Sequence, residues 1–166
     1  MAAARPGKVR IDLLVFDVDG VLTDGTVMID ADGHEWKRVR YRDLDAVTAA
    51  MASGLRVAFL SGESGPLLMR IAERFGISLL SAGSKDKVRG LTALAQDAGV
   101  PMSRVCYVGD SDRDAPALAL AAIGLAPRDA SALARKAADA VLRTAGGDGV
   151  AVEVIERLTR TGCLRK

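Results

Sequence analysis

Short apolar runs alternate with longer segments of helical periodicity along most of the chain, and this alternation limits the folds open to it. The runs with the character of buried strands lie at residues 11–16, 56–61, 78–82 and 104–110, with weaker ones at 122–126 and 140–143. The helical patterns lie at residues 44–53, 66–75, 86–98, 114–122 and 149–160. Such alternation predicts a three-layer α/β fold, with a central parallel sheet covered by helices on both faces.

One stretch, residues 26–42, interrupts the alternation directly after the first predicted strand. Its two strand-like halves flank Ala31-Asp32-Gly33, a sequence suited to a tight turn, so we expect a β-hairpin insertion. An isolated ribbon of this kind is marginally stable, and several subunits could pair their hairpins into a closed sheet. The alternative is that Trp36 and Val39 fold back onto the core of their own subunit.

Charge and composition argue against several classes of function. The chain holds 23 Lys and Arg against 21 Asp and Glu, so it has no strong basic field for nucleic acid or for an anionic membrane. Its 166 residues suit a single domain, expected at residues 9–160, with flexible termini at 1–8 and 161–166. Two cysteines and an N-terminus without an apolar leader segment predict a cytoplasmic protein.

Two carboxylates, Asp17 and Asp19, end the first apolar run in the sequence VFDVDG. Residues two apart on a strand point the same way, so both side chains would lie at the carboxyl end of the strand, where parallel sheets bind ligands. A hard cation such as Mg²⁺ would offset their mutual repulsion and accept oxygen ligands. With a phosphate ester bound there, one aspartate could attack phosphorus and the other could handle the leaving-group proton. The plainer alternative is that Asp-x-Asp opens a turn or caps a helix.

The other predicted strand ends carry groups that would complete this chemistry. The hydroxyl of Ser61 and the backbone amides after it could hold phosphoryl oxygens, and Lys87, in preference to Lys85, could neutralise their charge. Asp110 could complete a metal site, and Asp114 could bind the metal or orient its ligands. Taken singly, Ser61 and the lysine fit an ordinary helix cap and a solvated helix residue better, and each aspartate could simply be a helix cap.

The pieces occur in the order DVDGVLTDG, LSG, a lysine and GDSDRD, and this set resembles the motifs of the haloacid dehalogenase superfamily over almost the whole chain. The resemblance implies a Rossmann-like haloacid dehalogenase fold and a phosphatase rather than a dehalogenase. It also implies that Asp17 is the nucleophile and Asp19 the general acid and base. Mg²⁺ would bind the carboxylates of Asp17 and Asp110 and the backbone carbonyl of Asp19. The remaining catalytic and orienting residues would be Ser61, Lys87 and Asp114.

A closer resemblance covers residues 9–158 and includes DVDGVLTDG, DADGHEWK, RDLDAV, LSGE, GDSDRD and GGDGVAVEVI. These stretches are similar to the capless phosphatases of 3-deoxy-2-ulosonate phosphates, namely the 3-deoxy-D-manno-octulosonate 8-phosphate phosphatases and their nonulosonate 9-phosphate relatives. The resemblance implies a hairpin in place of a cap domain, Mg²⁺ as cofactor, a phosphorylated sugar acid as substrate, and a homotetramer. In that family the hairpins form a central barrel, and a neighbouring subunit helps to close the site.

The resemblance places substrate contacts after the second predicted strand. Gly62 and Glu63 follow Ser61, and the glutamate resembles the nonulosonate enzymes, since the octulosonate enzymes usually have arginine there. Arg74 lies about three helical turns further on and could pair with Glu63 or with the substrate. The alternative is an exposed helix salt bridge, which would contribute little.

The tail departs from the family, because GGDGVAVE has Asp148 and Val152 where the family has arginines. The loss of two cations would weaken the binding of an anionic sugar acid. This departure favours an alternative function, a phosphatase for another small phosphorylated metabolite. A further alternative is a non-catalytic assembly domain related to the C-terminal part of sialate cytidylyltransferases. The presence of every motif residue argues against that reading.

Overall fold

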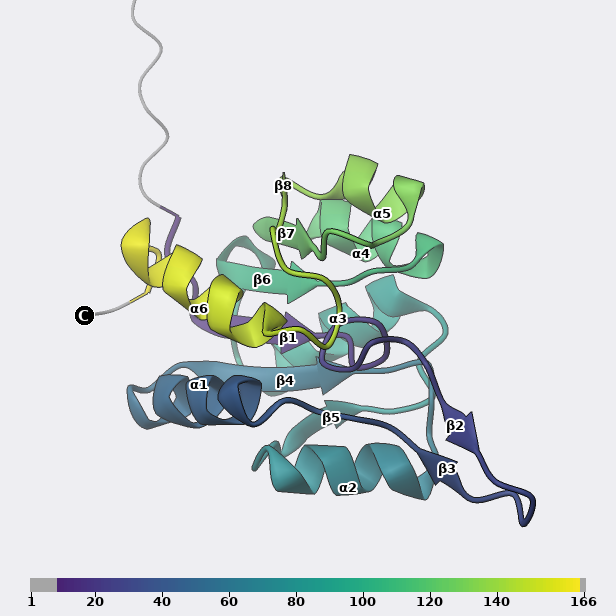
Figure 1. The fold of residues 1–166 in the computed structure, drawn as a ribbon. Helices are drawn as coiled ribbons and strands as arrows, with labels where there is room; N and C mark the ends of the chain where they lie inside the picture. The colour runs from purple at the N-terminus through teal and green to yellow at the C-terminus, as the bar shows by residue number, and fades with distance from the viewer. Residues whose placement is uncertain (1–8, 165–166) are drawn as a thin grey trace, which may run out of the picture.

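A six-stranded parallel sheet forms the centre of the computed structural model, which describes residues 9–164 (Figure 1). The strand order is β5-β4-β1-β6-β7-β8, so β1 lies in the interior of the sheet, between β4 and β6. The strands are β1 Leu13–Phe16, β4 Arg56–Leu60, β5 Leu79–Ser81, β6 Val105–Val108, β7 Ile123–Ala126 and β8 Ala140–Val141. The predicted parallel sheet is confirmed, and its carboxyl edge brings the loops after β1, β4 and β6 together.

Helices cover both faces of the sheet, because each central strand is apolar on both sides. In β1, Leu14 and Phe16 belong to one buried cluster, and Leu13 and Val15 belong to the other. Three helices pack on the first face and three on the second (Figure 1). The first set is α1 Tyr41–Ala52, α2 Pro66–Arg74 and α6 Val150–Arg160. The second set is α3 Lys87–Asp97, α4 Ala115–Leu120 and α5 Ala132–Ala137. Among residues 9–164 no helix is both long and apolar enough to cross a bilayer.

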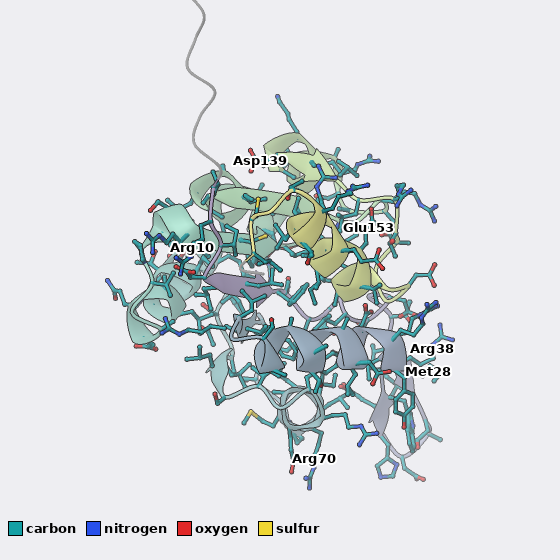
Figure 2. The ribbon with its side chains drawn as sticks, turned by 90° about the vertical axis from the view of Figure 1, so that its left-hand side faces the viewer. Arg10, Met28, Arg38, Arg70, Asp139 and Glu153 are labelled. Carbon is teal, nitrogen blue, oxygen red and sulfur yellow. The ribbon has the colours of Figure 1, made fainter. Side chains whose placement is uncertain are left out.

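The predicted hairpin forms, but it is shorter than residues 26–42. Strands β2 (Met28–Ile29) and β3 (Glu35–Trp36) pair antiparallel, and α1 already begins at Tyr41. The ribbon projects away from the helical layers (Figure 1), and Met28 and Arg38 lie on the opposite side of the molecule from Arg10 in Figure 2. The Trp36 side chain is 57% exposed, so its predicted alternative packing onto the subunit's own core is wrong, although Val39 does pack there.

The C-terminal segment is packed up to Leu164, in contrast to the expected flexible terminus at 161–166. The backbone amide of Ile11 donates to the carbonyl of Cys163 at 2.8 Å, and Cys163 itself is buried. This contact ties the end of α6 to the residues that lead into β1. Residues 1–8 and 165–166, the rest of the expected loose ends, lie outside the described residues.

Two loops from opposite ends of the chain cross at the carboxyl edge of the sheet. Residues 17–24, the carboxylate loop, follow β1, and residues 144–149, the tail loop, lead into α6. The amide of Gly147 donates to the carbonyl of Val21 at 2.9 Å. A Cβ built on Gly146 would lie 2.1 Å from the backbone oxygen of Gly20, so only glycine permits this approach.

We therefore expect Gly146→Ala to lower the free energy of unfolding by about 2 kcal/mol or more, because the added methyl meets backbone atoms that cannot rotate away. Chemical denaturation monitored by circular dichroism measures the change. Gly65→Ala is the control, since a Cβ there has open space and its cost should stay below about 1 kcal/mol. Equal losses in the two variants would contradict the close approach.

Candidate active site

A buried lysine lies among carboxylates at the carboxyl edge of the sheet. Lys87 is the first residue of α3, and its side chain is 4% exposed. Its Nζ lies 2.8 Å from Asp17 Oδ2 and 3.4 Å from Asp114 Oδ1, and it donates to the carbonyl of Leu60 at 3.2 Å. Lys85 is exposed to solvent. The structure therefore places Lys87, rather than Lys85, beside Asp17.

Asp114 is held by hydrogen bonds on both of its carboxylate oxygens. Its Oδ1 accepts from the Tyr107 hydroxyl at 2.5 Å, and its Oδ2 accepts from the amide of Asp110 at 3.1 Å and the hydroxyl of Ser111 at 2.7 Å. Burial acts to raise the pKa of Asp114, but the charge of Lys87 and these hydrogen bonds outweigh it, and the net shift is downward. This bonding suits a residue that orients Lys87 and the Asp110 loop. Tyr107, in an apolar strand, gave no sequence signal of this contact.

Asp17, Asp110 and Asp114 each offer a carboxylate oxygen within 4.8 Å of the other two. Burial and the charge of Asp114 raise the pKa of Asp110 to about 7, and burial with the same neighbour raises the pKa of Asp17 well above its ordinary value. One lysine thus faces three carboxylates. The cluster has the donor chemistry of a divalent-cation site, because hard cations take carboxylate oxygens and would offset this excess negative charge.

Asp110 packs closely against the carboxylate loop. A Cβ built on Gly20 would lie 2.1 Å from Asp110 Oδ2, and the backbone of Gly20 has a positive φ of 80°. Glycine at this position therefore lets the loop after β1 approach the loop after β6. The close packing also brings the backbone beside Asp19 to the carboxylate cluster, as a metal site shared by the two loops requires.

The carboxylate of Asp19 lies outside the cluster that Asp17 forms with Asp110 and Asp114. Strand β1 ends at Phe16, and the chain then turns, so the alternation of a strand no longer applies. Asp19 Oδ1 instead pairs with Nζ of Lys37 at 2.7 Å. Lys37 follows the hairpin and reads in the sequence as an ordinary charged ribbon residue, so no pattern marked it as part of this site.

Ser61 lies where the sequence placed it, directly after β4. Its side chain is buried, and its Oγ accepts from the amide of Glu63 at 3.0 Å. Its backbone carbonyl accepts from the amide of Ser84 at 2.9 Å, three residues before Lys87. Gly62 is half-buried beside it. The loop after β4 therefore adjoins the lysine and could present a hydroxyl and backbone amides to an anion.

Arg74 does not pair with Glu63 among the described residues. It is the last residue of α2, where it donates to the Tyr41 hydroxyl at 3.1 Å and stacks over the Tyr41 ring at 5.4 Å. Glu63 is exposed on the loop before that helix. The two residues predicted to bind substrate together therefore lie at different ends of α2, and only Glu63 adjoins the Ser61 loop.

The tail loop is anchored by two acidic residues. Asp148, at a position where arginine was expected, forms an ion pair with Arg40, and the amide of Val152 donates to Asp43 Oδ1 at 3.1 Å. Asp43 is fully buried in α1, and burial raises its pKa although the backbone amides of α6 act to lower it. Asp43 Oδ2 has no partner within residues 9–164. No sequence pattern predicted the contact between Asp43 and Val152, which are 109 positions apart in the chain.

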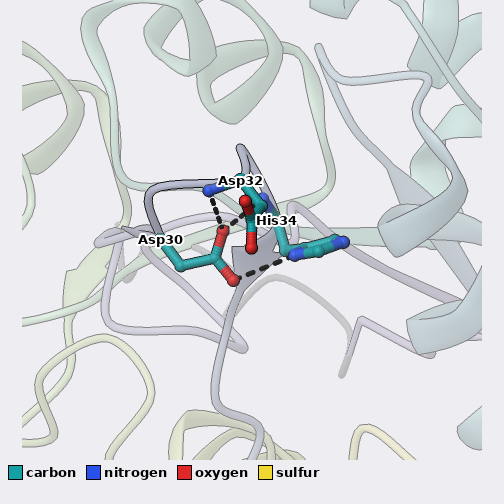
Figure 3. Close-up of side chains that lie close together, drawn as sticks. All are labelled: Asp30, Asp32 and His34. Atoms are coloured by element: carbon teal, nitrogen blue, oxygen red, sulfur yellow. Dashed lines mark hydrogen bonds and ion pairs between the residues drawn. The ribbon is translucent and has the colours of Figure 1, made fainter.

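A second group of metal-ligating residue types lies at the hairpin tip (Figure 3). Asp30 Oδ1 accepts from the amides of Asp32 and His34, and its Oδ2 lies 2.9 Å from His34 Nδ1. All three side chains are exposed. These bonds close the turn between β2 and β3, which accounts for the grouping without a ligand.

The fold and the cluster at its carboxyl edge together define a phosphoric monoester hydrolase, and comparisons with known proteins agree. A family model described as haloacid dehalogenase-like hydrolase matches residues 72–154. The 3-deoxy-D-manno-octulosonate 8-phosphate phosphatase of Haemophilus influenzae is 36% identical over 149 residues, covering 90% of this chain and 83% of the relative. The chain belongs to the haloacid dehalogenase-like hydrolases, in the branch of these phosphatases.

Solved structures support the same relationship. The octulosonate 8-phosphate phosphatase of Moraxella catarrhalis, in complex with magnesium ion, phosphate ion and 3-deoxy-D-manno-octulosonate, has a TM-score of 0.88 at 30% identity, covering 93% of this chain and 88% of that one. The cobalt-bound Haemophilus influenzae enzyme has a TM-score of 0.87 at 35% identity, covering 92% and 89%. The predicted fold class and the resemblance to capless phosphatases are confirmed.

Proposed function

We propose that this protein is a Mg²⁺-dependent phosphatase that removes the terminal phosphate from a 3-deoxy-2-ulosonic acid. The contact that carries the proposal is the buried one between Lys87 Nζ and Asp17 Oδ2, at 2.8 Å, beside two further carboxylates. Burying this much charge is costly, and a binding site for a phosphoryl group and a cation accounts for it. The relatives supply the substrate class, since their names specify octulosonate 8-phosphate.

The proposed reaction proceeds through an aspartyl-phosphate. Asp17 attacks phosphorus while the bond to the sugar oxygen breaks, and Asp19 gives its proton to that oxygen. Asp19 then takes a proton from the water that cleaves the acyl-phosphate and so returns to its starting state. Lys87 neutralises Asp17 and the phosphoryl oxygens, and Ser61 with the Gly62 amide holds those oxygens in place.

The donors available fit Mg²⁺. The carboxylates of Asp17 and Asp110 and the backbone carbonyl of Asp19 would hold the ion, while Asp114 orients the Asp110 loop. When bound, Mg²⁺ would supply positive charge that neutralises the phosphate and the attacking carboxylate.

Mg²⁺ should stabilise the folded protein, because it offsets repulsion in the carboxylate cluster. At 100 times its dissociation constant the ion contributes about 2.7 kcal/mol, which should raise Tm by about 5–10 °C in a thermal melt. Asp110→Asn should abolish most of this rise. Asp112→Asn, an exposed residue of the same turn, should keep it. A rise retained in Asp110→Asn would place the ion elsewhere.

Two observations bear on the carbon-chain length of the sugar acid, and they favour different lengths. The relatives compared are octulosonate enzymes, which supports the eight-carbon 8-phosphate. Glu63 resembles the nonulosonate type and is exposed beside Ser61, where it would meet the sugar rather than the phosphate. We include both acids in the proposed substrate class.

Phosphate release in the presence of Mg²⁺ tests the proposal. The panel contains octulosonate 8-phosphate, deaminoneuraminate and N-acetylneuraminate 9-phosphates, and common sugar and glycolate phosphates, with Asp17→Asn as the blank. We expect a strong preference for one ulosonate phosphate. A preference for another ester would support the second candidate function, a phosphatase for a different small metabolite. That candidate is favoured by the Asp148–Arg40 pair, because the tail loop carries Asp148 in place of a cation and this aspartate also occupies Arg40.

Self-association is part of the proposal. Val27, Met28, Ile29 and Trp36 leave an exposed apolar surface on the hairpin, and pairing four hairpins into a barrel would bury it. The expected state is a homotetramer. Sedimentation velocity at micromolar concentration measures it directly, with Met28→Glu expected to dissociate the assembly. A monomeric wild-type protein would contradict the barrel.

A further inference from the structure

Lys37 makes the most shielded ion pair that links the hairpin to the rest of the molecule. It is the first residue after β3, and its Nζ lies 2.7 Å from Asp19 Oδ1. The Lys37 side chain is only 15% exposed. A charged side chain on a projecting ribbon would ordinarily extend into water, so this inward placement calls for a physical reason.

The neighbouring pairs of the same segment show the contrast. Residues 37–40, the exit segment, connect β3 to α1. Arg38 pairs with Asp24 at 2.9 Å, yet its side chain is 82% exposed, and Arg40 pairs with Asp148 at the surface. Surface pairs of this kind contribute little, because solvent screens them. Of these three cations of the exit segment, Lys37 is the one whose side chain is largely shielded from solvent.

Asp19 depends on Lys37 for its orientation. Asp17 is held by the amide of Val18 and by Lys87, and Asp114 accepts bonds on both oxygens. In the described part of the chain, Lys37 is the one side chain or amide that binds the carboxylate of Asp19. Without it, the Asp19 side chain would rotate freely on a turn, and a proton donor must lie within hydrogen-bond reach of its acceptor.

We propose that Lys37 is a positioning residue for the acid–base step, which fixes the carboxyl group of Asp19 from the hairpin side. The inference rests on the proposed function of Asp19. In that step the Asp17–phosphorus bond forms, the bond between phosphorus and the leaving oxygen breaks, and the proton moves from Asp19 to that oxygen. Lys37 contacts the carboxyl group of Asp19 and not the phosphorus or the leaving oxygen, so it acts through the geometry of Asp19.

A dependence on the leaving group distinguishes this role from a structural or substrate-binding one. A sugar alkoxide leaves poorly unless it is protonated, whereas the nitrophenolate of p-nitrophenyl phosphate leaves without help. The ratio kcat/KM reports the steps up to departure of that group, so the later attack of water does not obscure the comparison.

The experiment compares kcat/KM for the best sugar-acid phosphate of the panel and for p-nitrophenyl phosphate, at saturating Mg²⁺. We expect Lys37→Met to lose about 10- to 100-fold on the sugar phosphate and less than about threefold on the aryl ester, since a positioned general acid is worth about 10²–10⁴-fold. Lys37→Arg should recover much of the loss. Arg38→Met is the control, because it removes the ion pair between Arg38 and Asp24 of the carboxylate loop. This variant should leave kcat/KM unchanged for both esters.

A double variant sharpens the test. If Lys37 acts through Asp19, then Lys37→Met added to Asp19→Asn should cost nothing further on the sugar phosphate. Equal losses on both esters, or independent losses in the double variant, would overturn the proposal and make Lys37 a substrate-binding or structural residue. If the wild-type protein hydrolyses neither ester, the proposed function fails and the inference with it. A phosphatase that fails only the leaving-group comparison refutes the inference alone.

Discussion

Asp17→Asn is expected to lower phosphatase activity by at least about 10⁴-fold while leaving the fold intact. The substitution removes the carboxylate oxygen that lies 2.8 Å from Lys87 Nζ and that we propose as the nucleophile. It also removes a buried carboxyl group, whose pKa is raised well above the ordinary value by burial first and by the charge of Asp114 second. The folded state should therefore lose little stability, and circular dichroism should give a Tm within a few degrees of wild type.

Asp12→Asn is the matched control for this loss. Asp12 precedes β1 at the opposite end of the same strand, where it pairs with Arg10 and Arg104. Its replacement should leave the rate of phosphate release unchanged. Residual turnover in a clean Asp17→Asn sample, above that of a buffer blank by more than a trace, would remove Asp17 from the role of nucleophile.

Lys87→Met should affect both stability and activity. The side chain is 4% exposed and is the cation that faces Asp17 and Asp114 in the buried cluster. Removing one partner of a buried ion pair leaves charge uncompensated and typically costs about 3–5 kcal/mol. We expect a loss of this size in urea denaturation without metal. We also expect activity to fall by at least about 10²-fold, because the phosphoryl oxygens lose their cation.

Lys85→Met separates this effect from a general loss of positive charge. Lys85 lies two residues earlier in the chain but is exposed, so its removal should change the free energy of unfolding by less than about 0.5 kcal/mol. If Lys87→Met proved as mild as Lys85→Met, the buried cluster would not be the charged centre of the site.

The sequence predicted the sheet well, because the central strands β1 and β6 are uninterrupted apolar runs followed by turn residues. It also predicted which loops meet, since the ends of parallel strands share one edge. This is why the sequence alone could place Lys87, Asp110 and Asp114 near Asp17. The structure also accounts for the preference for Lys87 over Lys85, because Lys87 is the first residue of α3 and its side chain is buried against Asp17.

Contacts outside regular strands were not predictable in the same way. Strand alternation did not predict that the carboxylate of Asp19 would lie outside the cluster of Asp17, Asp110 and Asp114, because the strand ends at Phe16 and the chain turns. Lys37 and Asp43 were missed because their partners depend on how a hairpin and a helix are placed, and periodicity carries no information about that. The suggested Arg74–Glu63 pair does not form for a related reason, since Arg74 instead donates a hydrogen bond to the hydroxyl of Tyr41 from α1.

The crossing of the carboxylate loop and the tail loop has a consequence for synthesis on the ribosome. Asp17, the proposed nucleophile, directly follows β1, yet the loop that carries it rests on Gly146 and Gly147, and α6 is held by Asp43. The sheet can begin to assemble once β6 emerges, because β1 pairs with β4 and β6. The catalytic geometry needs residues 144–152 as well, so nascent chains and fragments that lack this segment should be folded in part and inactive.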